Sequence, residues 1–148
     1  MLQENLSILF ERDIRRLQTE INAYGDENSI WKISGSISNS GGNLSLHLLG
    51  NLQHYIGAIL GKTGYKRNRP EEFTLKNIPI SEINASIEHT IGVVKQTIRL
   101  LTEESLGNEY PEKVFDHPMT TEYFLLHLLA HLNYHLGQIN YHRRNMKS

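Results

Sequence analysis

The sequence predicts an all-α fold, a four-helix bundle with long crossover connections. Apolar residues recur at spacings of three and four in four separate segments, and no stretch of useful length alternates as a β-strand does. The connections between these segments are longer than those of a simple up-down bundle, so neighbouring helices can run parallel. With 148 residues and 39 % apolar content, we expect the chain to form one domain, residues 1–148.

The first two predicted helices differ in their polar faces. The first spans residues 2–24, carries one apolar stripe and stops before Gly25. The second starts between Ser40 and Asn43 and runs to about residue 62, and the side opposite its leucines is small and polar: His47, Gly50, Asn51, His54, Gly57, Ala58 and Gly61. A solvated face would normally carry Lys and Glu, so we expect a close neighbour or a cavity on that side.

The last two predicted helices carry regular core stripes. The third starts near Ser81, a candidate N-cap, and ends near Gly107. The fourth starts at Thr120 or Thr121 and ends at Met146. The loops that precede them, "TGYKRNRPEEFTLKNIPI" and "GNEYPEKVFDHP", are long enough to contribute to a site.

Composition excludes several classes of protein and of site. Cysteine is absent, which excludes disulfides, thiolate ligands and a cysteine nucleophile, so a metal would have to use His, Asp, Glu or water. The net charge is −1 with no basic block, which argues against a nucleic-acid partner. No apolar run approaches 20 residues, and the N-terminal segment carries charges among its apolar positions. We therefore expect a cytoplasmic protein with no membrane partner.

The stretch "HLLAHLNYHLGQINYHRR" repeats histidine every four residues, at His127, His131 and His135. This spacing places the rings on one helix face, where two of them can hold one metal. The glutamate of H-E-x-x-H is missing, so the metalloprotease site of that motif is excluded. Helical angles turn His131 and His135 toward the bundle and leave His127 at the exposed edge, and we expect His142 to be a helix-end residue favoured by the helix dipole.

A third ligand has to come from another helix. If the second and fourth helices are antiparallel neighbours, His47 lies at the height of His131 and His135, whereas His54 lies about 10 Å away, near His127. His47 points away from the main apolar face, so either the site lies in a cleft at the bundle edge or the second helix is buried on both sides. Two interpretations stay open: a three-His metal site, or a polar stripe that is only partly buried.

Three stretches resemble segments of the DinB-like (damage-inducible B) superfamily. Together with the number of helices and the length, the resemblance covers nearly the whole chain. "HLNYHLGQI" is similar to the H-x-x-x-H-[R]-G-Q segment of its last helix, and "LSLHLLGNLQHYI" is similar to its second helix. "GYKRNRPEEF" resembles the Arg-rich loop of one branch that has no assigned function. The resemblance implies an up-down-down-up bundle and a divalent metal, commonly nickel or zinc, held by His47, His131 and His135. It also implies homodimers, with the glycine-bearing side of the second helix as one packing surface.

The chain departs from that family pattern at one position. Many relatives carry Arg directly after the second histidine of the last helix, and Leu136 stands there, so an anion-binding role is not expected at that position. Gly137 is expected to allow another segment to approach the helix. Gln138 is either a hydrogen-bond partner of a ligand histidine or a surface amide.

Two functions of different classes follow. The first is a metal-dependent transferase or hydrolase acting on a small molecule, since relatives include transferases and isomerases that use low-molecular-weight thiols. The alternative is a non-catalytic helical dimer with a structural or relic metal site. The sequence does not identify a general base. Glu71 or Glu72 could reach the site, and Arg67 or Arg69 could bind an anionic group of a substrate. We expect, however, that these four charged loop residues are exposed to water.

Overall fold

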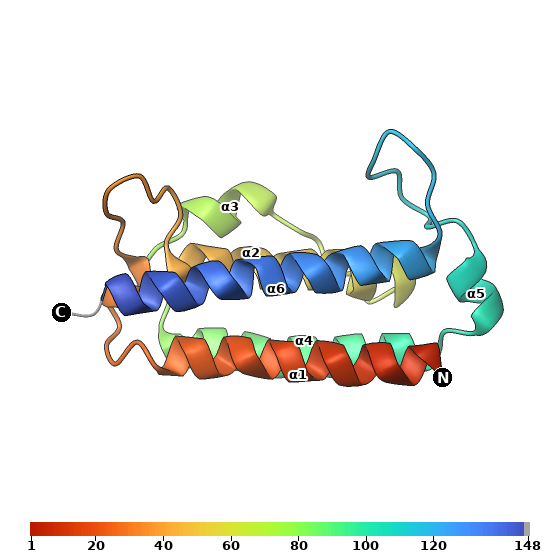
Figure 1. Ribbon diagram of the computed structural model, residues 1–148, viewed down its shortest axis with the longest axis horizontal. Coiled ribbons are helices and arrows are strands. Elements are labelled where there is room, and N and C mark those ends of the chain that lie inside the picture. Colours follow the sequence, from red (N-terminus) through yellow and green to blue (C-terminus); the bar gives the residue numbers. More distant parts are fainter. Residues whose placement is uncertain (147–148) are drawn as a thin grey trace.

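Four long helices make up most of the fold: α1 (Leu2–Asn22), α2 (Gly41–Leu52), α4 (Ile80–Arg99) and α6 (Thr121–Asn145). The computed structural model describes residues 1–146. The chain colours in Figure 1 show α1 and α6 running in one direction and α2 and α4 in the other. This is the up-down-down-up order, and the predicted all-α bundle class is confirmed. Within the described residues, no helix is both long and apolar enough to cross a membrane.

The predicted apolar stripes form the core. The stripe of α1 is almost completely buried at Leu6, Phe10 and Ile14, because α1 packs against both α4 and α6. The helix ends also follow local signals. Gly25 has a φ of +82°, a left-handed conformation that favours glycine, just after α1 stops. The Thr120 side chain accepts a hydrogen bond from the backbone of Tyr123 and so caps α6.

α2 is buried on both sides, which was one of the two predicted alternatives. It packs against α4 and α6, while a short helix, α3 (Arg69–Thr74), covers it on the side away from α1 and α4 (Figure 1). The glycines of this helix make room for side chains of the same chain: a Cβ at Gly42 would overlap the Trp31 ring, and one at Gly50 would overlap the Glu72 carboxylate. The sequence analysis expected a close neighbour on the glycine-bearing side of this helix. At Gly42 and Gly50 that neighbour is a side chain of the same chain and not a second copy of the protein.

The second predicted helix is not α-helical throughout. After Leu52 it continues as a π-helix, η2 (Gln53–Leu60), in which backbone hydrogen bonds close five residues apart, such as that from Gly61 N to the Ile56 carbonyl. π-helices are rare and occur often at functional sites. A stripe of apolar residues is compatible with both α-helical and π-helical hydrogen bonds. The sequence therefore contains no sign that the helix changes from α to π after Leu52.

The third predicted helix starts within one residue of the expected position, but its predicted cap and its predicted end are wrong. α4 begins at Ile80 with Pro79 in the N-cap position, so Ser81 lies inside the helix and caps nothing. α4 stops at Arg99, and a separate helix, α5 (Glu103–Gly107), follows. Thr102 and Ser105 form a reciprocal capping box, which starts a new helix and explains the break.

Candidate metal centre

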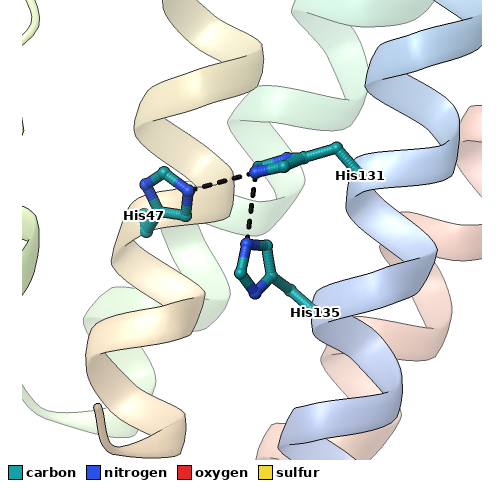
Figure 2. A group of neighbouring side chains, drawn as sticks. All are labelled: His47, His131 and His135. Atoms are coloured by element: carbon teal, nitrogen blue, oxygen red, sulfur yellow. Dashed lines mark hydrogen bonds between the residues drawn. The ribbon is translucent and has the colours of Figure 1, made fainter. Parts of the chain in front are cut away.

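Three histidines from two helices converge on one point (Figure 2). His47 comes from α2, and His131 and His135 come from successive turns of α6. The Nε2 atom of His131 lies 3.2 Å from the Nε2 atom of His47 and 3.2 Å from that of His135. One nitrogen of each ring lies within 4.8 Å of the others. The structure therefore brings together the three residues that the sequence analysis proposed as ligands.

The two 3.2 Å spacings suit ligands of one divalent metal. Zinc–nitrogen bonds of 2.0–2.1 Å place neighbouring nitrogens of a tetrahedral site roughly 3.3 Å apart. Two imidazole nitrogens that face each other with lone pairs repel unless a proton or a cation lies between them. The close approach of the Nε2 atoms therefore fits a shared cation.

The proton positions on two of the rings are set by neighbours. The Nδ1–H of His47 donates to the Glu72 carboxylate at 3.1 Å, and that of His135 donates to the side-chain oxygen of Gln138 at 2.7 Å. In neutral imidazole, protonation of Nδ1 leaves Nε2 with its lone pair. Both rings are thus held in the tautomer that leaves the lone pair on Nε2, and Gln138, although exposed, is a hydrogen-bond partner of His135.

Glu72 is not the solvated loop carboxylate that the sequence analysis expected. Only 7 % of its side chain is exposed, and it accepts two hydrogen bonds from Arg67, at 2.8 Å from Nε and 2.9 Å from Nη2. Burial acts to raise the pKa of Glu72, but the hydrogen bonds from Arg67 and His47 outweigh it and hold the pKa below its ordinary value. Glu72 therefore stays ionised beside His47, in a space that Gly50 leaves open.

His131 lies at the centre of the group and is the most strongly perturbed of the three. Burial, together with the neighbouring rings of His135 and His47, lowers its pKa to about 4. It is neutral at physiological pH, which is the state a metal ligand requires. Burial likewise lowers the pKa of His135, against the opposing effect of its hydrogen bond to Gln138. The Nδ1 atom of His131 has no hydrogen-bond partner within residues 1–146.

The remaining helix histidines lie outside this group. His127 is exposed, as expected, and its ring packs beside Phe115 and Phe124. His54 lies 3.1 Å from the Glu112 carboxylate. Neither belongs to the cluster of converging nitrogens.

His142 is not the dipole-favoured helix-end residue that was expected. It is only 3 % exposed, and its Nε2–H donates to the Lys32 carbonyl at 2.8 Å. Its Nδ1 accepts from the Tyr24 hydroxyl at 2.7 Å. Burial lowers the pKa of His142, against the opposing effect of the bond to Lys32. The expectation failed because loop residue Lys32 folds over the end of α6, which local sequence does not show.

Two cavities flank the three histidines. A cavity of about 480 Å³ borders His135 and is lined by Tyr134, Tyr141 and the loop at residues 36–39. A smaller cavity of about 160 Å³ borders His47 and His131. The smaller cavity borders the small, polar side of α2, where the sequence analysis expected a close neighbour or a cavity. No motif in the sequence predicts the cavity beside His135, because it is lined by segments far apart in the chain.

A model of the DinB superfamily matches residues 9–139, which include all three converging histidines. The chain belongs to the DinB superfamily. A search of curated proteins found no match. In this DinB-superfamily chain, Leu136 is 8 % exposed and packs in the core. Gly137 has open space around its Cβ position, so the expected close approach of another described segment does not occur.

Proposed function

We propose that this DinB-superfamily protein is a metal-dependent enzyme that transfers a group between a small thiol and an electrophilic small molecule. The observation that supports it most is the convergence of three Nε2 atoms between two cavities. Three protein ligands leave further coordination positions open, as in catalytic rather than purely structural sites.

A divalent metal at the three histidines would supply a Lewis acid that lowers the pKa of a thiol or water ligand toward neutrality. Nickel and zinc both suit a set of neutral imidazole ligands. Glu72 and Gln138 orient His47 and His135, and Arg67 holds Glu72 in place. These contacts fix the donor atoms before a ligand arrives, which reduces the cost of ordering the site.

In the proposed reaction the thiol sulfur attacks an electrophilic carbon. A sulfur–carbon bond forms as the bond from carbon to the leaving group breaks, the leaving group departs with that electron pair, and the thiol proton passes to water. The cavity beside His135 offers room for a second reactant, and its lining includes the aromatic rings of Tyr134 and Tyr141. Hydrolysis, in which water replaces the thiol, is the neighbouring reaction class.

The test combines metal analysis with an assay of thiol conjugation. Protein loaded with zinc or nickel is expected to bind one ion per chain and to accelerate the reaction of 2-mercaptoethanol with 1-chloro-2,4-dinitrobenzene, and a chelator is expected to abolish both. His135→Ala should lose metal and activity, whereas His127→Ala, one helical turn outside the cluster, should keep the metal. Metal binding without conjugation or hydrolysis across an electrophile panel would contradict the enzyme and favour a structural metal site.

A further inference from the structure

The cavity beside His47 and His131 has a lining suited to a negatively charged ligand. Two guanidinium groups, from Arg67 and Arg69, line it together with the Asn51 amide, and no carboxylate belongs to its lining within the described residues. Its volume of about 160 Å³ is that of roughly five water molecules in the liquid, enough for one small acidic group.

The two arginines differ in how their charge is balanced. Arg67 is fixed by Glu72 through Nε and Nη2, and its remaining Nη1 makes no hydrogen bond within residues 1–146. Arg69 lies over the Phe73 ring, with its guanidinium carbon 5.4 Å from the ring centre, and it forms no ion pair in the described part of the chain. One positive charge at this cavity is therefore not neutralised by the protein.

Asn51 is the independent sign of a ligand. Asn51 is buried, with 6 % of the residue exposed, and its Oδ1 atom has no hydrogen-bond partner among residues 1–146. Buried amides are almost always hydrogen-bonded, because an unpaired one costs about 1–3 kcal/mol. A half-turn of the amide would put its NH₂ group in the place of this oxygen, and in that orientation Asn51 can donate to an anion in the cavity.

We propose that this cavity binds the carboxylate of the thiol substrate, with Arg69 and the Nη1 atom of Arg67 as the cationic partners and Asn51 as a hydrogen-bond donor. This rests on the proposed thiol chemistry and names its substrate class as small thiols that carry a carboxylate. Because His47 and His131 line the same cavity, a carboxylate held there places the rest of the molecule beside their Nε2 atoms. Because Arg69 forms no ion pair in the described part of the chain, its guanidinium can bind a carboxylate through two parallel hydrogen bonds, which give direction as well as attraction.

The experiment compares mercaptoacetate with 2-mercaptoethanol, which has a similar size and the same thiol but no carboxylate. Calorimetric titration of the zinc-loaded full chain is expected to show mercaptoacetate binding at least about 10-fold more tightly, the effect of one charge-assisted hydrogen bond. The side-chain Nε–H resonances of Arg67 and Arg69 should shift on addition of mercaptoacetate to metal-free protein, which reports the contact without activity.

Arg69→Gln should remove most of the advantage of mercaptoacetate and leave the affinity for 2-mercaptoethanol unchanged. Arg144→Gln is the matched control, because Arg144 lies over the Tyr141 ring at the same 5.4 Å but does not line this cavity. Asn51→Leu removes the amide at nearly constant volume and should also weaken mercaptoacetate binding.

Equal affinities for the two thiols in the unaltered protein would overturn the assignment, as would equal losses in the Arg69 and Arg144 variants. The proposed function is tested separately: a zinc titration that shows no binding would contradict it. Zinc binding with no preference for mercaptoacetate would refute the carboxylate site alone.

Discussion

Two histidine sites of this bundle, the buried His142 and the partly buried three-His cluster, use the nitrogens of their rings differently. Both nitrogens of His142 are occupied by the protein: Nδ1 accepts from Tyr24 and Nε2–H donates to the Lys32 carbonyl. The ring fastens the end of α6 to the segments that follow α1, and no donor or acceptor capacity is left for a ligand.

In the three-His cluster, by contrast with His142, one nitrogen of each ring is not bound to a donor or acceptor outside the cluster. His47 and His135 each use Nδ1 to bind a neighbour, and their Nε2 atoms point at the Nε2 atom of His131 instead of at a protein acceptor. The difference shows that burial alone does not make a histidine a ligand. In His47 and His135, one nitrogen is held by the protein and the other is aimed at a point shared with His131.

The largest effect expected from this contrast is on metal affinity. His131→Ala removes the central histidine of the proposed site and should lower zinc affinity by more than about 100-fold, beyond the 10–100-fold typical of losing a partner that only orients a ligand. His142→Gln should leave zinc affinity unchanged. Competition titration against a chromophoric chelator measures both, and loss of zinc from the His142 variant while it stays folded would show that the two sites are not separate.

A smaller loss is expected when a ligand keeps its nitrogen but loses its orientation. Glu72→Gln removes the carboxylate that accepts from His47 and should weaken zinc binding about 10–100-fold. Glu112→Gln is the control, because Glu112 also lies 3.1 Å from a histidine, His54, outside the cluster. Equal zinc affinities for these two variants in the chelator titration would refute the orienting role of Glu72.

Packing around Glu72 predicts the next effect. Gly50→Ala places a methyl group where the Glu72 carboxylate lies and should destabilise the protein by about 1–3 kcal/mol, as overpacking does. Gly137→Ala, on the exposed face of α6 with open space around it, should instead stabilise the protein by up to about 1 kcal/mol. Urea unfolding followed by circular dichroism measures both changes, and a Gly50 variant as stable as the unaltered chain would contradict the tight fit.

The smallest effect concerns the pH dependence of stability. Burial lowers the pKa of His142, so below the unfolded-state value of about 6.5 the unfolded chain binds a proton that the folded chain does not. The free energy of unfolding should therefore fall as the pH decreases below about 6.5. His142→Gln should make this fall shallower, while His89→Gln, at an exposed position of α4, should not. Parallel curves for the two variants between pH 7 and pH 5 would exclude a contribution from His142.

The helix periodicity of the sequence determined the bundle class, because burial of one apolar stripe per helix leaves few other folds. The spacing of His131 and His135 determined that they share a face, and the height of His47 along an antiparallel α2 placed it beside them. These inferences succeeded because they depend on regular helix geometry, in which position along the chain translates directly into position in space.

Tertiary structure alone decided the surroundings of those histidines. Glu72 and Arg67 were expected in water because charged loop residues usually are, and the folding of α3 over α2 buried them as an ion pair against His47. His142 was expected at a free helix end, and the Lys32 loop closed over it. Each of these contacts joins residues far apart along the chain or across an irregular loop, where backbone angles follow no repeat. A helical pattern in the sequence predicts the direction of a side chain, but the residues that contact this side chain are determined by the tertiary packing.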